Sequence, residues 1–133
     1  MAKKPRSKAK TAEPSLFKRY RSLCIGLFAA GFLLYANTLG HDYAFDDSVA
    51  ITANEFTKKG AAGIPDLLTK DLFAGIYGQS LDIGGGRWRP LSLVMFALEW
   101  EVMGGPSPGL SHFINVVLFA CSMVLMFLVL VRW

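Results

Sequence analysis

The sequence predicts an α-helical integral membrane protein in which two transmembrane helices flank an extracytoplasmic loop with short surface helices. Of the 133 residues, 53% are hydrophobic and only 18% are charged, against about 25% in an average soluble domain. No formal charge occurs between Ser22 and Gly40, and none occurs between Val102 and Val131. At about 1.5 Å per residue, a helix over either segment can cross the ~30 Å hydrocarbon core of a bilayer.

The alternative for the two apolar segments is a pair of buried core helices in a soluble protein. A soluble chain of this length has little material with which to enclose two such helices, so this alternative is the weaker one. The boundaries are a basic cytoplasmic tail at 1–21, a first transmembrane helix at 22–40, a loop at 41–109, a second transmembrane helix at 110–131 and a cytoplasmic end at 132–133.

The distribution of charge predicts the orientation. Residues 1–21 contain eight basic side chains and one acidic one, whereas residues 40–90 contain five basic and seven acidic ones. Lys and Arg close to a span stay on the cytoplasmic side, so we expect a multi-pass protein of the cell (inner) membrane with a cytoplasmic N-terminus. We expect the basic tail to contact the lipid bilayer and not nucleic acid. A cleaved signal peptide is the alternative for the first span, although its apolar stretch exceeds the usual length.

Two short helices are predicted within the loop. Asp66 is expected to be the N-cap of a helix over residues 67–73. Residues 91–103 are almost entirely apolar but too few to span a bilayer, so we expect them to form a helix along the membrane surface. In that position Glu99 and Glu101 would face lipid headgroups.

Two acidic residues follow the first span directly, in the sequence Phe45-Asp46-Asp47. Adjacent side chains in a helix point about 100° apart, so the two carboxylates cannot reach one spot. One of them is therefore expected to act on a substrate while the other caps a helix beginning near Ser48. The alternative is a pair of solvated loop acids.

A basic residue, Arg89, lies between Trp88 and Pro90 near the end of the loop. A guanidinium group beside an aromatic ring suits a phosphate or carboxylate partner, and Pro90 fits the first turn of a following helix. The alternative is a membrane anchor, with Trp88 in the interface and Arg89 among the headgroups.

His112 and Asn115 open the second apolar segment. They are three residues apart and therefore share a helix face. Polar side chains at this depth usually face a protein interior or a water-filled cavity, and hydrogen bonding between helices is the alternative. The two cysteines and two histidines are too scattered to form a metal cluster, so we expect no metal and no cofactor.

The order of these motifs is similar to a known pattern. It resembles the N-terminal part of the GT-C superfamily of multispanning glycosyltransferases, and within it the protein O-mannosyltransferase-like branch, whose members often carry tetratricopeptide repeats. The resemblance covers residues ~20 to 133. The residues that carry it are Asn37, Phe45-Asp46-Asp47, Ile51, Asn54, Arg89-Pro90-Leu91 and His112-x-x-Asn115.

The resemblance implies an activity and roles for individual residues. That family transfers a sugar from a polyprenyl-phosphate carrier to an acceptor hydroxyl, with inversion at the anomeric carbon. The resemblance would make Asp46 the base and Asp47 a supporting acid, and it would direct Arg89 at the phosphate of the sugar donor. His112 and Asn115 would support the site.

The chain departs from the family pattern in two respects. Position 119 is Phe, where family members often have a second His, and the family has about ten or more spans where this sequence contains two. We therefore expect a fragment of a larger helical bundle, inactive alone, whose partners include missing downstream transmembrane helices. The competing interpretation is a non-enzymatic two-span subunit or scaffold of an envelope complex.

Overall fold

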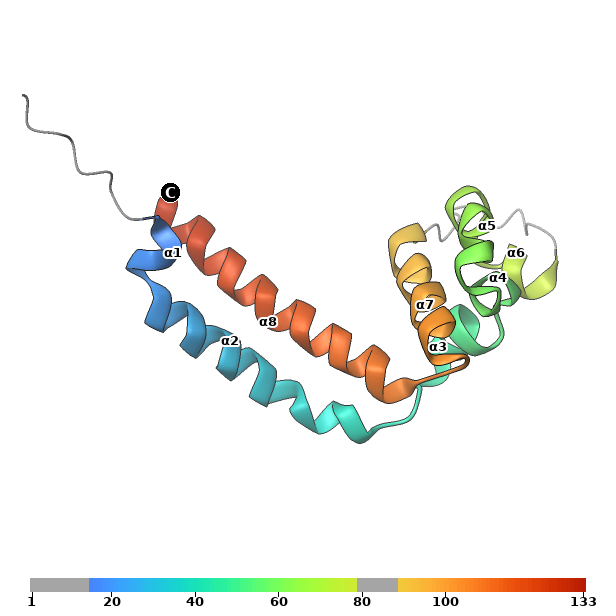
Figure 1. Ribbon diagram of the computed structural model, residues 1–133, viewed down its shortest axis with the longest axis horizontal. Coiled ribbons are helices and arrows are strands. Elements are labelled where there is room, and N and C mark those ends of the chain that lie inside the picture. The colour runs from blue at the N-terminus through green and yellow to red at the C-terminus, as the bar shows by residue number, and fades with distance from the viewer. Residues whose placement is uncertain (1–14, 79–88) are drawn as a thin grey trace, which may run out of the picture.

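The computed structural model describes residues 15–78 and 89–133, and every regular element within these two ranges is helical. Two helices are long, α2 (Arg21–Tyr35) and α8 (Pro108–Arg132). They lie side by side as an antiparallel hairpin, with the shorter helices gathered at one end of it (Figure 1). The prediction of an α-helical chain is confirmed for these residues. Most of the predicted basic tail, together with Trp88, lies outside them.

Both predicted spans correspond to helices that are long and apolar enough to cross a membrane. The first comprises Arg21–Gly40, with a mean hydropathy of 1.7, because α2 continues into the short 3-10 helix η1 (Ala36–Gly40). The second comprises Pro108–Arg132, with a mean hydropathy of 2.8. Both agree with the predicted spans to within two residues.

The two long helices pack through small side chains and aromatic rings. A Cβ atom at Gly31 would lie 2.7 Å from Met123 Sδ and 3.2 Å from Ala120 Cα, so the absence of a side chain at Gly31 lets the two helices pack closely here. Such close packing holds helices together in lipid, which provides no hydrophobic force between them. Three edge-to-face ring pairs extend the contact, namely Tyr20–Phe127, Phe32–Phe113 and Tyr35–Phe119.

The remaining helices, apart from α1 (Leu16–Arg19), form a compact unit that we call the helical cluster (residues 45–78 and 89–103). Leu67, Leu93 and Ala97 are its buried centre. Partly buried apolar side chains surround them, among them Phe56 and Val94. Its elements are α3 (Phe45–Asp47), the π-helical η2 (Ser48–Thr52), α4 (Glu55–Lys58), the 3-10 helix η3 (Gly60–Gly63), α5 (Ile64–Thr69), α6 (Ala74–Tyr77) and α7 (Pro90–Met103).

The predicted N-cap at Asp66 is wrong. Helix α5 already begins at Ile64, with Pro65 in its first turn, and it ends at Thr69. Asp66 lies inside the helix, and its carboxylate pairs with the Lys70 ammonium group at 2.8 Å. That hydrogen bond is the main reason why the pKa of Asp66 lies below its usual value.

Helix α7 is present as predicted, with its proline in the first turn. Of its two glutamates, Glu101 is exposed, whereas Glu99 does not face outward to lipid headgroups. Glu99 is only 8% exposed, and its carboxyl group is hydrogen-bonded to the Ser111 hydroxyl of α8. Glu101 Oε2 accepts a hydrogen bond from the Ala61 N–H at 3.1 Å. The expectation is overturned for Glu99, because α7 also packs against the start of α8, which supplies Ser111 as a polar partner.

Candidate functional site

The two adjacent carboxylates have different surroundings. Helix α3 begins at Phe45, three residues earlier than predicted, so Asp47 stands at its third position. The Ala44 N–H donates a hydrogen bond of 2.8 Å to Asp47 Oδ2, which satisfies one of the free amides at the start of the helix. Asp46 is exposed, and its side chain makes no hydrogen bond with another described residue. The structure thus gives the capping role to Asp47 and leaves the Asp46 carboxylate free.

Asp46, Asp47 and Arg89 line a single hollow in the helical cluster, which we call the acidic hollow. Its volume is about 310 Å³. The two acids come from α3, and Arg89 immediately precedes α7, so folding of the loop brings together residues that are far apart in the sequence. The other lining residues are Val49, Ala50, Leu72, Phe73, Ser92, Leu93 and Phe96.

The charged groups of the acidic hollow do not neutralise one another. The ion pairs between described residues are Lys58–Glu55, Lys59–Asp66 and Lys70–Asp66, and none involves the acidic hollow. Carboxylates and a guanidinium group on one apolar-walled surface can therefore engage a ligand. A carboxylate can accept a proton from a hydroxyl, and a guanidinium group can bind a phosphate through two hydrogen bonds.

His112 and Asn115 lie beside the acidic hollow and not in it. They share a helix face, as predicted, because both line the same two spaces. One is a small cavity of about 20 Å³, whose other lining residues are Tyr43, Asp47, Ile51, Phe96 and Ser111. The other, which we call the span-end hollow, has a volume of about 430 Å³ and is also lined by Tyr35, Thr38, His41, Asp42, Ala44, Val116 and Phe119.

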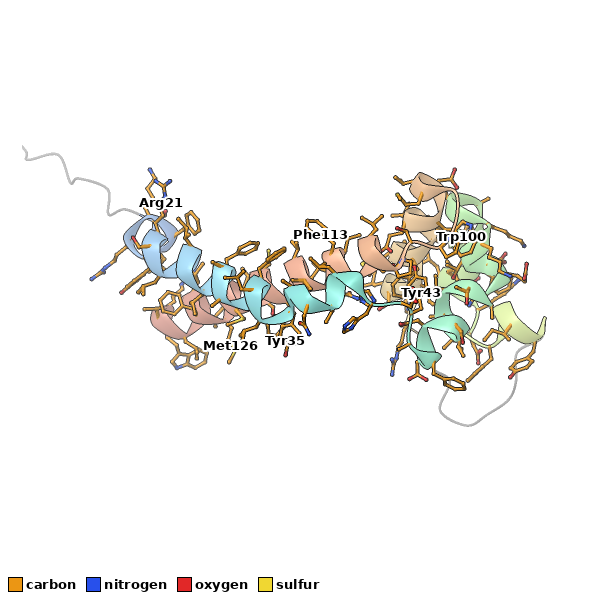
Figure 2. The ribbon with its side chains drawn as sticks, turned by 90° about the horizontal axis from the view of Figure 1, so that it is seen from below. Arg21, Tyr35, Tyr43, Trp100, Phe113 and Met126 are labelled. Atoms are coloured by element: carbon orange, nitrogen blue, oxygen red, sulfur yellow. The ribbon has the colours of Figure 1, made fainter. Side chains whose placement is uncertain are left out.

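A hydrogen-bond network that the sequence analysis missed joins the helical cluster to the hairpin. Tyr43 lies at this junction (Figure 2), where its hydroxyl accepts a hydrogen bond from the Ser107 N–H at 3.1 Å. The Tyr43 hydroxyl is also 3.1 Å from Ser111 Oγ, and Ser111 in turn contacts Glu99. Burial raises the pKa of Glu99, an effect that its hydrogen bond with Ser111 opposes. The sequence contains one signal for this network, which is the position of an acidic residue, Glu99, within the apolar segment 91–103.

Comparison with known proteins identifies relatives. The chain is 38% identical over 106 residues to protein O-mannosyl-transferase Tmtc1 of Drosophila melanogaster, covering 78% of this chain and 12% of the relative. It is 31% identical over 104 residues to Tmtc2 of the same organism, covering 77% and 11%. It is 34% identical over 99 residues to human TMTC2, covering 69% and 10%.

The chain therefore spans only about a tenth of the length of these relatives. No family model matches it, and no solved structure matches it significantly. The identity extends over roughly three quarters of the chain for both Drosophila proteins, and the fold contains two helices suited to a membrane. The resemblance predicted from the motifs is thus confirmed: this chain is a membrane protein related to a part of the protein O-mannosyl-transferases.

Proposed function

We propose that this chain supplies part of the catalytic site of a membrane glycosyltransferase, which transfers a sugar from a polyprenyl-phosphate carrier to an acceptor hydroxyl. The observation that carries this proposal is the acidic hollow, where Asp46, Asp47 and Arg89 line one space. The relatives are named protein O-mannosyl-transferases, so mannose and the hydroxyl group of a protein are the sugar and acceptor to test first.

In the proposed reaction, Asp46 is the base. Its exposed carboxylate, free of hydrogen bonds to other described residues, accepts the proton of the acceptor hydroxyl as the oxygen attacks C1 of the sugar. The bond between C1 and the phosphate oxygen breaks, and the polyprenyl phosphate leaves with the bonding electrons. Arg89 binds the phosphate and stabilises the charge that develops on it. Asp47, held by the Ala44 N–H, keeps α3 in position.

We further propose that additional transmembrane helices complete the site. The matched segment is about a tenth of each relative, and the acidic hollow lies on one small helical cluster. A carrier with a long hydrocarbon chain requires an apolar surface within the bilayer, and more than two helices would enclose it better. In this arrangement the basic N-terminus lies in the cytoplasm and the helical cluster lies on the opposite side of the membrane.

Asp46→Asn tests the proposed base. Transfer of mannose from a polyprenyl phosphate should be measured in membranes that contain the chain with any segments that follow it in the natural protein. We expect turnover to fall by at least ~100-fold, the usual contribution of a general base, while the protein still accumulates in the membrane.

Asp47→Asn is the matched comparison, since the two acids are neighbours of the same type. It should weaken the start of α3 and reduce stability more than Asp46→Asn does, with a smaller loss of turnover. Normal turnover in the Asp46 variant would exclude this base. If wild-type membranes showed no sugar transfer at all, the result would support the non-enzymatic two-span protein instead.

A further inference from the structure

The small cavity between the acidic hollow and the span-end hollow has the size and lining of a water site. Its volume of about 20 Å³ exceeds the 10–15 Å³, roughly, that a single buried water requires. Five of its seven lining residues carry polar side chains, which are Tyr43, Asp47, Ser111, His112 and Asn115. A buried water normally makes about three hydrogen bonds, and this lining offers enough groups to provide them.

The polar groups around the small cavity differ in how far their hydrogen-bonding capacity is already used. The hydroxyls of Tyr43 and Ser111 are bonded to each other and to further protein groups. Asp47 uses one carboxylate oxygen, Oδ2, for the Ala44 N–H. The His112 imidazole makes no hydrogen bond with another described residue, and its Nε2 atom is buried. The groups with free capacity are thus the Asp47 carboxylate on α3 and, on α8, the His112 imidazole and the Asn115 amide. Of the two on α8, Asn115 is exposed and can bond to solvent, whereas His112 Nε2 is buried.

We propose that the small cavity binds one water molecule, and that this water links the Asp47 carboxylate to the His112 imidazole. The link makes His112 a positioning residue for the acidic pair. Asp47 stands at the third position of α3 and also lines the acidic hollow. A water-mediated link from Asp47 to α8 therefore fixes the orientation of α3 and of its two carboxylates. A buried ring nitrogen without a partner, as His112 Nε2 is among the described residues, is costly, and the water removes that cost.

The link also provides a path for a proton, and this part of the inference rests on the proposed function. A proton taken from the acceptor hydroxyl must leave the acidic pair before the next turnover. The proton passes from the Asp46 carboxyl group to the Asp47 carboxylate through solvent in the acidic hollow, which both residues line. The Asp47 carboxyl group then gives its proton to the water in the small cavity while that water gives one of its own to the imidazole. The water is regenerated, and one proton has moved from α3 to α8. His112 also lines the larger span-end hollow, through which the proton can reach solvent.

Solid-state NMR of the whole 133-residue chain in lipid bilayers tests the water link directly. The chain contains two histidines, so ¹⁵N-histidine labelling gives few ring signals, and His41→Asn leaves those of His112 alone. Asp residues labelled with ¹³C report on the other end of the link. We expect magnetisation to pass from a slowly exchanging water to both the His112 ring and the Asp47 carboxylate.

Substitutions of the two neighbouring aspartates provide a matched comparison. Asp47→Asn should shift the His112 ring resonances, because the hydrogen-bond partner of the water changes. Asp46→Asn should leave them in place, because Asp46 does not line the small cavity. Two results would overturn the proposal. One is an equal shift of the His112 ring resonances in Asp47→Asn and Asp46→Asn. The other is no transfer of magnetisation from water to the His112 ring in the chain that retains both aspartates. The transfer from water to the His112 ring is measured without either aspartate substitution, so it tests the proposal even if Asp47→Asn fails to fold.

The test separates this inference from the proposed function, because the spectra are recorded without substrate. Failure of the transferase function would leave an observed water link intact. Failure of the water link would remove the positioning role of His112 and leave the acidic hollow as it is.

Discussion

At the scale of single residues, Glu99 shows how one buried carboxyl group connects two parts of the chain. It lies on α7 and is 8% exposed, and its hydrogen bond to Ser111 reaches the first turns of α8. No ion pair between described residues involves it. Burial without a cation raises the pKa of Glu99, because the charged form loses its hydration and gains no opposite charge.

This raised pKa predicts how pH affects stability. The folded chain binds the Glu99 proton more tightly than the unfolded chain, so the protonated carboxyl group stabilises the fold at low pH. That contribution is lost as the pH rises through the folded-state pKa. Glu99→Gln keeps a neutral hydrogen-bonding group beside Ser111 and cannot ionise.

We therefore expect Glu99→Gln to raise the unfolding temperature at neutral pH and to flatten its dependence on pH. Thermal unfolding in detergent micelles from about pH 4 to pH 8, a range that covers carboxyl titration in proteins, measures this. The wild-type chain should lose stability relative to the variant as the pH increases. The interpretation fails if the difference between the two chains is constant with pH or has the opposite sign.

Arg89 is the second residue with a specific prediction. Arg89→Lys retains the positive charge and loses the planar pair of donors that matches a phosphate. With the loss of about 1.5 kcal/mol from a charge-assisted hydrogen bond, kcat/KM for the polyprenyl-phosphate donor should fall about 10-fold.

Kinetics of sugar transfer at varied donor concentration measure that effect. Lys58→Arg is the matched control, because Lys58 pairs with Glu55 away from the acidic hollow and its replacement should leave donor kinetics unchanged. Unaltered donor kinetics in Arg89→Lys would return Arg89 to the role of a headgroup anchor.

At the scale of elements, the helices of the cluster depend on their contacts with one another. Helices α4, α5 and α6 contain four, six and four residues, far fewer than the 12–15 or so that an isolated helix needs in water. Side-chain caps and a shared apolar core must therefore stabilise them. The predicted start of α5 was wrong because this helix has no side-chain cap and already begins at Ile64, with Pro65 in its first turn.

Asn54 is the side chain that joins most of these elements. It is fully buried, and its Oδ1 accepts hydrogen bonds from the N–H groups of Phe56 and Thr57 at the start of α4. Its Nδ2 donates to the Leu72 carbonyl at 3.3 Å, next to α6. A Cβ atom at Gly75 would lie 2.1 Å from Asn54 Oδ1, so the backbone of α6 packs directly on this amide.

Asn54→Ala should destabilise the helical cluster by about 2–4 kcal/mol, because it removes a helix cap and leaves buried backbone groups without partners. Asn54→Asp should also be destabilising, since it retains the cap but places a buried carboxylate oxygen against the Leu72 carbonyl oxygen. Hydrogen exchange of the α4 and α6 amides measures both. Glu55→Ala, which removes an exposed ion pair, should cost under about 1 kcal/mol. A cost for Asn54→Ala no larger than that control would contradict the assigned role.

At the scale of the whole molecule, the hairpin holds the helical cluster at one end, while α1 and the end of α8 lie together at the other (Figure 1). This arrangement fits the proposed two crossings of a bilayer, since both long helices are apolar enough to span one. The excess of basic residues before the first span predicts that the end carrying α1 faces the cytoplasm.

Cysteine labelling tests this orientation. Ser15→Cys and Ala62→Cys lie at opposite ends of the molecule on exposed positions, and they are placed singly in a background without Cys24 and Cys121. A membrane-impermeant maleimide applied to intact cells should label Ala62→Cys at once and Ser15→Cys only after the membrane is opened. The reverse pattern would show that the proposed orientation is inverted.

The sequence by itself determined the two long apolar helices, which are suited to cross a membrane. Long charge-free runs such as 22–40 are a local property, and a bilayer requires each spanning helix to satisfy its own backbone hydrogen bonds. It also indicated the shared face of His112 and Asn115, because helical spacing alone decides which side chains are neighbours. The family resemblance followed from the order of motifs along the chain.

Only the tertiary structure decided which of these residues meet. The acidic hollow exists because the loop folds back and brings Arg89, just before α7, to the same space as the acids of α3. The contact between Glu99 and Ser111 likewise depends on how α7 packs against the start of α8. Contacts between residues far apart in sequence arise from the packing of whole elements, and local spacing and propensity carry no record of that packing.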